Sequence, residues 1–166
     1  MKYSSTQSTN VDSINWNNSL LKSTYSTSYQ TAEYLTSDLE SATPIFIHVV
    51  NTNDEIVGQL GLRIIDSTVM YSSPLFKRYS KIISNIAKRI IWVHGPIIYS
   101  KNIEERKNIL TEILKEVNQV AEKYDVVYIE GETSPYDFFV DEDYKKIFSD
   151  NGYTKFNSKS FLADLD

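Results

Sequence analysis

A histidine follows an apolar run in the segment RIIWVHGP, residues 89–96. The β-branched run is typical of a buried strand, and the Gly-Pro step is typical of a strand end. Active sites in α/β folds often lie where a strand ends and the chain continues toward a helix. His94 and Gly95 are therefore candidate site residues, and His94 could donate or accept a proton near neutral pH. The alternative is a partly buried histidine whose ring bonds a backbone carbonyl.

Carboxylates and one amide are the other candidates for chemistry. Asp137 and Glu132 lie in a loop after a second apolar run, where a carboxylate could act as a base toward an amine. Gln30 and Glu33 follow the first predicted helix and could line a cleft for an acceptor substrate. The alternatives are that the loop carboxylates are merely solvated and that Gln30 bonds the backbone of the adjoining turn.

Arg89 belongs to a basic cluster that also contains Lys77, Arg78, Lys81 and Lys88. Such a cluster could bind the phosphates of a tRNA or of a nucleotide-linked precursor. The alternative is an ordinary solvated face. The net charge of −5 argues against a dedicated nucleic-acid binder. We therefore expect tRNA to be the one nucleic acid worth testing as a partner.

The composition excludes several kinds of site. The chain has no cysteine and only two histidines, His48 and His94, so disulfides, thiolate metal sites, cysteine nucleophiles and histidine-rich metal sites are excluded. We expect no metal. The N-terminus is polar, and no apolar run approaches the roughly 20 residues of a membrane-spanning helix. We therefore expect a cytoplasmic protein without a membrane span.

The apolar pattern predicts a flexible tail over residues 1–10 and one domain over residues 11–166. Two short helices come first, one beginning at Asp12 or Ser13 and one over residues 31–39. A hairpin follows, with strands over 44–51 and 55–65. In its second strand, Gly58 and Gly61 indicate a bulge or a close backbone approach.

The second half of the chain alternates between strands and helices. Asn102 followed by Glu105 resembles a capping box, which predicts a helix from residue 102. Because this helix joins the strands at 89–94 and 126–130, we expect those strands to be adjacent and parallel. The expected elements are strand 89–94, helix 102–124, strand 126–130, helix 141–149 and strand 155–165.

This order resembles the GNAT acyltransferase fold, an α/β (α+β) fold in which helices flank a mixed sheet. Three blocks are similar to its FemAB-like branch, the aminoacyltransferases that build peptidoglycan cross-bridges. They are residues 16–34, residues 56–65 with the strand end at 92–98, and residues 152–165. The resemblance implies transfer of an acyl or aminoacyl group to an amine, with backbone donors at a strand bulge stabilising the oxyanion. Thr31 and Tyr34 stand where the family has Ser and Trp.

FemAB-like proteins usually carry two such units. The resemblance therefore implies that this chain is half of a functional unit and needs a second unit or a second copy of itself. Edge strands left uncovered in a single unit invite such pairing. Phe156, Phe161 and Leu162 are the expected contact points.

CoA is the cofactor that the GNAT resemblance implies. GNAT enzymes hold its pyrophosphate with a Q/R-x-x-G-x-G/A loop before a helix N-terminus. The corresponding stretch here is GPIIYS, residues 95–100, in which Pro96 lacks an N–H and the later glycines are absent. We therefore expect no cofactor and CoA binding no tighter than millimolar. Two alternatives stay open: a non-catalytic module that binds a ligand or partner, and a CoA-dependent N-acetyltransferase with a degenerate loop.

Overall fold

The computed structural model describes residues 2–37, 42–66, 88–137 and 142–154. The predicted basic cluster is described only at Lys88 and Arg89. The predicted final strand and the expected contact residues Phe156, Phe161 and Leu162 lie outside the described residues.

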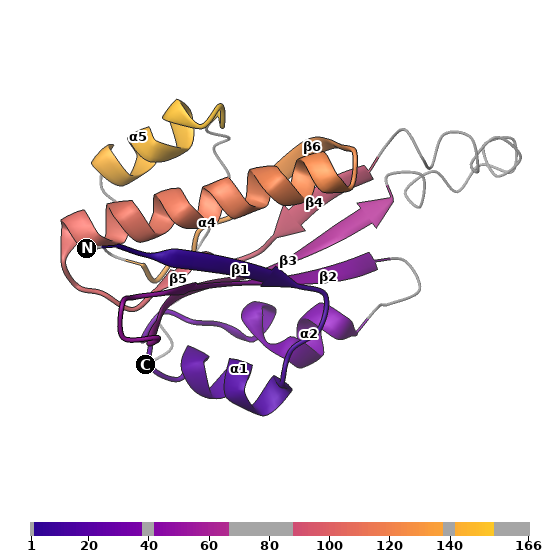
Figure 1. Ribbon diagram of the computed structural model, residues 1–166. Helices are drawn as coiled ribbons and strands as arrows, with labels where there is room; N and C mark the ends of the chain where they lie inside the picture. The colour runs from indigo at the N-terminus through magenta and orange to yellow at the C-terminus, as the bar shows by residue number, and fades with distance from the viewer. Residues whose placement is uncertain (1, 38–41, 67–87, 138–141, 155–166) are drawn as a thin grey trace, which may run out of the picture.

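A mixed sheet forms the centre of the molecule (Figure 1). Within the described residues its order is β1-β2-β3-β4-β6, and β5 pairs with β3. All pairs are antiparallel except β4 with β6, which are parallel as predicted. The strands are β1 (Ser4–Ser8), β2 (Ala42–Val50), β3 (Ile56–Asp66), β4 (Lys88–Trp92), β5 (Ile97–Ile98) and β6 (Val126–Gly131).

Helices cover both faces of the sheet (Figure 1). One face carries α1 (Ser13–Leu20), the 3₁₀ turn η1 (Ser28–Gln30) and α2 (Ala32–Thr36). The other face carries α4 (Ile103–Lys123), on which α5 (Glu142–Asp150) packs. The mixed sheet between two layers of helices agrees with the predicted fold class.

Alternation along the strands divides the core between these two faces. On β2, Ile45 and Ile47 belong to the apolar cluster that includes α4, whereas Phe46 belongs to the cluster with Trp16 of α1. Successive side chains of a strand point to opposite faces, so one apolar run supplies both clusters. The continuous run that predicted a strand is therefore a strand buried on both sides.

The predicted hairpin is confirmed, and its glycines lie at close approaches. A Cβ on Gly58 would lie 2.5 Å from Ile109 of α4, and one on Gly61 would collide with Leu35 of α2. The register of β2 shifts between Val49 and Val50, opposite the start of β3. The two glycines thus let a helix approach each face of β3.

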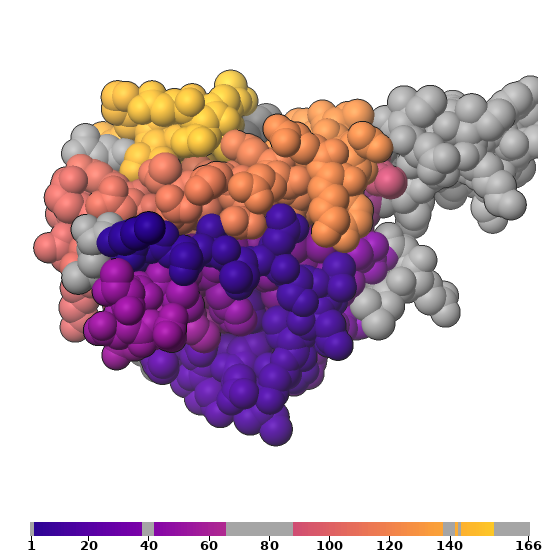
Figure 2. All heavy atoms as spheres, in the orientation of Figure 1, coloured from indigo at the N-terminus to yellow at the C-terminus, as the bar shows by residue number. Residues whose placement is uncertain are grey.

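The segment expected as a flexible tail instead contains β1. Ser4–Ser8 pairs along β2, and the hydroxyl of Ser5 donates to Glu116 of α4 at 2.7 Å. Figure 2 shows these N-terminal residues packed directly against α4. β1 is held by backbone pairing and polar contacts, so it needs no apolar side chains. Its sequence therefore lacks the apolar alternation from which a strand is predicted.

Candidate functional site

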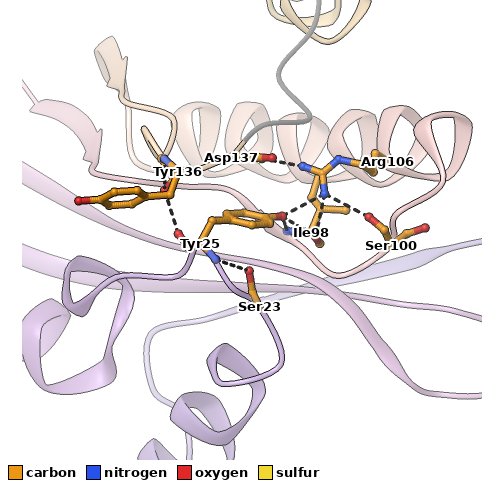
Figure 3. Close-up of polar contacts among 8 residues, drawn as sticks. Ser23, Tyr25, Ile98, Ser100, Arg106, Tyr136 and Asp137 are labelled. Atoms are coloured by element: carbon orange, nitrogen blue, oxygen red, sulfur yellow. Dashed lines mark hydrogen bonds and ion pairs between the residues drawn. The ribbon is translucent and has the colours of Figure 1, made fainter. Parts of the chain in front are cut away.

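The central strand is broken where the sequence predicted a strand end. β4 ends at Trp92 and β5 begins at Ile97, and between them His94 adopts a left-handed backbone conformation with a φ of 53°. β6 pairs with β4 as far as Gly131, whereas β5 pairs, among the described strands, with β3 alone. We call the space between β5 and residues 133–137 the wedge; Tyr25 and Arg106 fill it (Figure 3).

Gln30 holds the strand break in place. Its Nε2 donates to the carbonyl of Val93 at 2.7 Å and to that of Gly61 at 3.2 Å, and its Oε1 accepts from the Gly61 N–H at 2.8 Å. The side chain is fully buried. A Cβ on Gly95 would lie 2.9 Å from Gln30 Nε2. Gln30 and Gly95 are thus close together. The Gln30 amide forms hydrogen bonds with the backbone and does not line a cleft as the sequence had suggested.

His94 lies beside the exposed side chain of Tyr29. Its Nδ1 is 3.2 Å from the hydroxyl of Thr27, and its ring packs edge-on against Tyr29 with centroids 4.9 Å apart. Tyr29 also packs against Tyr34 of α2. His94 is only partly buried. The imidazole is therefore held at the surface, between Thr27 and Tyr29.

Asp137 is neither a solvated carboxylate nor an unpaired base. Its Oδ2 is 2.6 Å from Nη2 of Arg106, and both side chains are 2% exposed. A buried carboxylate needs such a partner, since an unpaired charge in the interior is strongly unfavourable. Asp137 thus joins the loop after β6 to α4.

Tyr25 completes this arrangement, and we call Tyr25, Arg106 and Asp137 the Tyr25 cluster (Figure 3). The Tyr25 hydroxyl donates to the carbonyl of Ile98 and accepts from the Ile98 N–H at 2.8 Å and from Arg106 Nη1 at 3.1 Å. Burial raises the pKa of Tyr25, so the hydroxyl stays protonated as a donor.

Tyr25 and Arg106 were not among the site residues predicted from the sequence. A signal for Arg106 was present, because it lies one turn before Ile109 and Leu110 on the apolar face of α4. A charged residue on such a face requires a buried partner. Tyr25 lies in a polar turn, and no local pattern distinguishes it from the other tyrosines there.

The remaining candidates, Glu33 and Arg89, make contacts of their own. Glu33 is exposed and accepts from Asn17 Nδ2 at 2.7 Å, and this hydrogen bond lowers its pKa. It links α2 to α1. Arg89 lies on β4, with Nη1 3.9 Å from the Glu130 carboxylate of β6. Arg89 is the second residue of β4, whereas the strand break follows Trp92, the last residue of β4. Arg89 therefore does not lie at the break.

The N-terminus of α4 is occupied by the chain's own side chains. Asn102 Oδ1 accepts from the Glu105 N–H at 3.1 Å, which confirms the predicted cap. Ser100 Oγ accepts from the Asn102 N–H at 3.0 Å and donates to the Glu105 carboxylate at 2.7 Å. Glu104 adds a second carboxylate to the first turn. Like charges repel, so these residues do not fit the pyrophosphate of CoA.

Within the described ranges, no group of three or more His, Asp or Glu side chains could hold a metal ion. In the same ranges, the structure contains no helix of the length and apolarity needed to cross a bilayer.

No protein-family model matches the chain, and no curated protein matches it in sequence. Solved structures that share its fold include three acetyltransferases. A probable acetyltransferase has a TM-score of 0.55 at 13% identity, with 100% of this chain and 99% of that one covered. An aminoglycoside antibiotic 6'-N-acetyltransferase from Acinetobacter baumannii has a TM-score of 0.57 at 7% identity, with 99% of each chain covered.

The third is a ribosomal-protein-alanine N-acetyltransferase from Brucella melitensis biovar Abortus 2308. Its TM-score is 0.54 at 11% identity, with 98% of this chain and 99% of that one covered. The chain has the GNAT acetyltransferase fold. At these identities the similarity concerns the fold alone, and function has to be argued from the site.

Proposed function

We propose that the chain is an acyltransferase domain of the FemAB-like kind, which transfers an acyl or aminoacyl group to an amine without CoA. The acetyltransferase fold supports acyl transfer as the reaction class. The choice of an aminoacyl ester over acetyl-CoA as the donor rests on the side chains at the N-terminus of α4. There Asn102 caps the Glu105 N–H, and the first turn carries the carboxylates of Glu104 and Glu105, which disfavour a pyrophosphate. An aminoacyl ester needs no such phosphate cradle, and a tRNA donor implies a cytoplasmic location.

His94 is the proposed proton carrier at the strand break. The amine nitrogen bonds to the ester carbonyl carbon, and the ester C–O bond then breaks. The proton lost by the amine passes to the imidazole and from there to the leaving oxygen. Thr27, at 3.2 Å from Nδ1, orients the ring, and Nε2 is the nitrogen proposed to exchange the proton.

The test is a transfer assay with two donors. The chain is incubated with a lysine-containing peptide and either radiolabelled aminoacyl-tRNAs or acetyl-CoA, and products are identified by mass spectrometry. We expect transfer from aminoacyl-tRNA only. His94→Gln should lower the rate by about 100-fold or more, whereas Glu33→Gln should leave it unchanged. Acetyl transfer from acetyl-CoA would instead support the CoA-dependent alternative.

The proposal includes a partner. In the FemAB-like interpretation this chain acts with a second GNAT-like unit or as a homodimer. Light scattering coupled to size-exclusion chromatography of the active sample tests this point. Activity of a strictly monomeric chain would show that one unit is sufficient.

A non-catalytic module that binds a ligand or partner is the second candidate. It is favoured by the pairing of Asp137 with Arg106 and by the bonds of Gln30 to the backbone, which give both side chains structural roles. Failure of both donors in the transfer assay, with a folded protein, would favour this candidate.

A further inference from the structure

The edge of β5 that faces the wedge carries the backbone groups of Ile98. The Tyr99 N–H bonds the carbonyl of Val57 on the β3 side at 2.9 Å. Because N–H groups alternate in direction along a strand, the Ile98 N–H and C=O point away from β3 and into the wedge. A strand edge whose outward backbone groups are not taken by a described neighbouring strand is where an extended ligand can add as a further strand.

An extended ligand that reached from the first turn of α4 to the break at His94 would lie along this edge. The break at His94 and the first turn of α4 lie at the two ends of the segment that contains β5. An arm that joins a phosphate at the N-terminus of α4 to an acyl group at His94 therefore has to run along Ile97–Ile98. Ligands of α/β sheets bind where neighbouring strands diverge, which in this chain is the wedge.

Tyr25 already occupies that edge. Its hydroxyl accepts from the Ile98 N–H and donates to the Ile98 carbonyl, so one side chain makes both backbone hydrogen bonds that a ligand would make. Arg106 Nη1 adds a bond to the same carbonyl at 3.0 Å. Tyr25 is only 5% exposed.

The cluster also holds Tyr25 from its backbone side. Ser134, in the loop after β6, donates its hydroxyl to the Tyr25 carbonyl at 2.8 Å. Asp137 of the same loop fixes Arg106, which bonds the Tyr25 ring hydroxyl. Removing Tyr25 from the wedge would take the acceptor from the Ile98 N–H and from the Ser134 hydroxyl, so the occupied state is the favoured one.

We infer that Tyr25 is an internal occupant of the wedge, which takes the place of an extended ligand on the β5 edge and thereby makes this chain reject thioester cofactors. Tyr25 is a specificity-determining residue in this view. The inference goes beyond the proposed function, because it holds whether or not the chain transfers acyl groups. It also locates ligand handling on the His94 side of the strand break rather than in the wedge.

Amide hydrogen exchange measured by NMR tests the two backbone bonds. In Tyr25→Phe, the Ile98 amide should exchange about tenfold faster than in the unmodified chain, because it loses its acceptor. The Tyr99 amide, bonded to Val57 on the opposite side, should keep its rate. Tyr29→Phe, at an exposed tyrosine of the same segment, is the matched control and should leave both amides unchanged. Equal Ile98 exchange in Tyr25→Phe and the unmodified chain would overturn the inference.

Ligand binding provides the second test of the inference. Calorimetry should detect no acetyl-CoA binding to the unmodified chain, whereas micromolar binding with a shift of the Ile98 amide resonance would overturn the inference. Tyr25→Ala should be stabilised against heat by p-cresol, and less by toluene, which lacks the hydroxyl. Equal effects of the two compounds would contradict the role of the hydroxyl. Neither the hydrogen-exchange experiment nor the binding experiment uses an acyl acceptor. Failure of the transfer assay therefore leaves the inference about Tyr25 unaffected.

Discussion

At the scale of single residues, polar side chains of similar sequence context have very different roles. Gln30 and Asp137 were both candidates for contacting a substrate. The structure uses Gln30 to bond the backbone at the break and Asp137 to neutralise Arg106. His94 remains at a surface, beside Tyr29. The candidate chemistry is therefore concentrated on His94, and its neighbours keep the strand break in shape.

The second histidine gives a pH prediction. His48 lies on β2 against Trp16, with ring centroids 4.8 Å apart, and burial lowers its pKa. The unfolded chain therefore binds a proton more readily, and stability falls as the pH drops below about 6.5, the usual histidine value. His48→Gln should lose less stability than the unmodified chain between about pH 7 and pH 5.

The measurement is urea denaturation across that range. The difference between the two proteins isolates His48 from the carboxylates that also titrate, because those carboxylates are common to both. Parallel stability curves would show that His48 does not contribute to the pH dependence.

At the scale of elements, α4 matters most, since it packs on the sheet and supplies Arg106 to the wedge. Its apolar face is continuous from Ile109 to Val120, and these residues are buried. Its N-terminus begins directly after the β5 segment. The helix thus supplies the side chains that pack on one face of the sheet and the two carboxylates of its own first turn.

Removing the cap of α4 should destabilise the protein. Asn102→Ala deletes the acceptor of the Glu105 N–H, and we expect a loss of about 1 kcal/mol in the free energy of unfolding. Asn108→Ala is the matched control, because Asn108 is exposed inside the same helix and alanine there favours helix formation. Chemical denaturation of both variants provides the comparison. If they lose equal stability, the cap does not contribute as described.

At the scale of the whole molecule, the sheet joins two apolar clusters. Trp16 belongs to the cluster under α1 and α2, and Trp92 to the cluster under α4. Both clusters take side chains from the same strands, so neither can lose its packing while the other keeps its strands in place. One cooperative unfolding transition is the physical consequence.

The two tryptophans of the chain make this testable. Trp16→Phe leaves fluorescence from one face of the sheet, and Trp92→Phe leaves it from the other. In each variant, the denaturation midpoint from fluorescence should coincide with the midpoint from circular dichroism. A fluorescence midpoint that departs from the circular dichroism midpoint in either variant would mean that the two faces unfold separately.

Local patterns in the sequence determined much of the fold. The cap signal at Asn102 and Glu105 predicted where α4 begins, and the apolar runs around a polar turn predicted the β2–β3 hairpin. The helix between two strands also predicted that β4 and β6 are parallel. These features follow from neighbouring residues, because periodicity and turn preference act over a few positions.

Only the tertiary structure decided β1 and the wedge. β1 has polar residues and exists because β2 offers it a free edge. Tyr25 and Arg106 are 81 residues apart in the chain, and Arg106 and Asp137 are 31 apart. Their hydrogen bonds require three segments that are distant in the sequence to meet around the Arg106 side chain. A pattern of neighbouring residues cannot predict such a contact. The sequence thus predicted where a site could lie, whereas the fold determined which side chains occupy it.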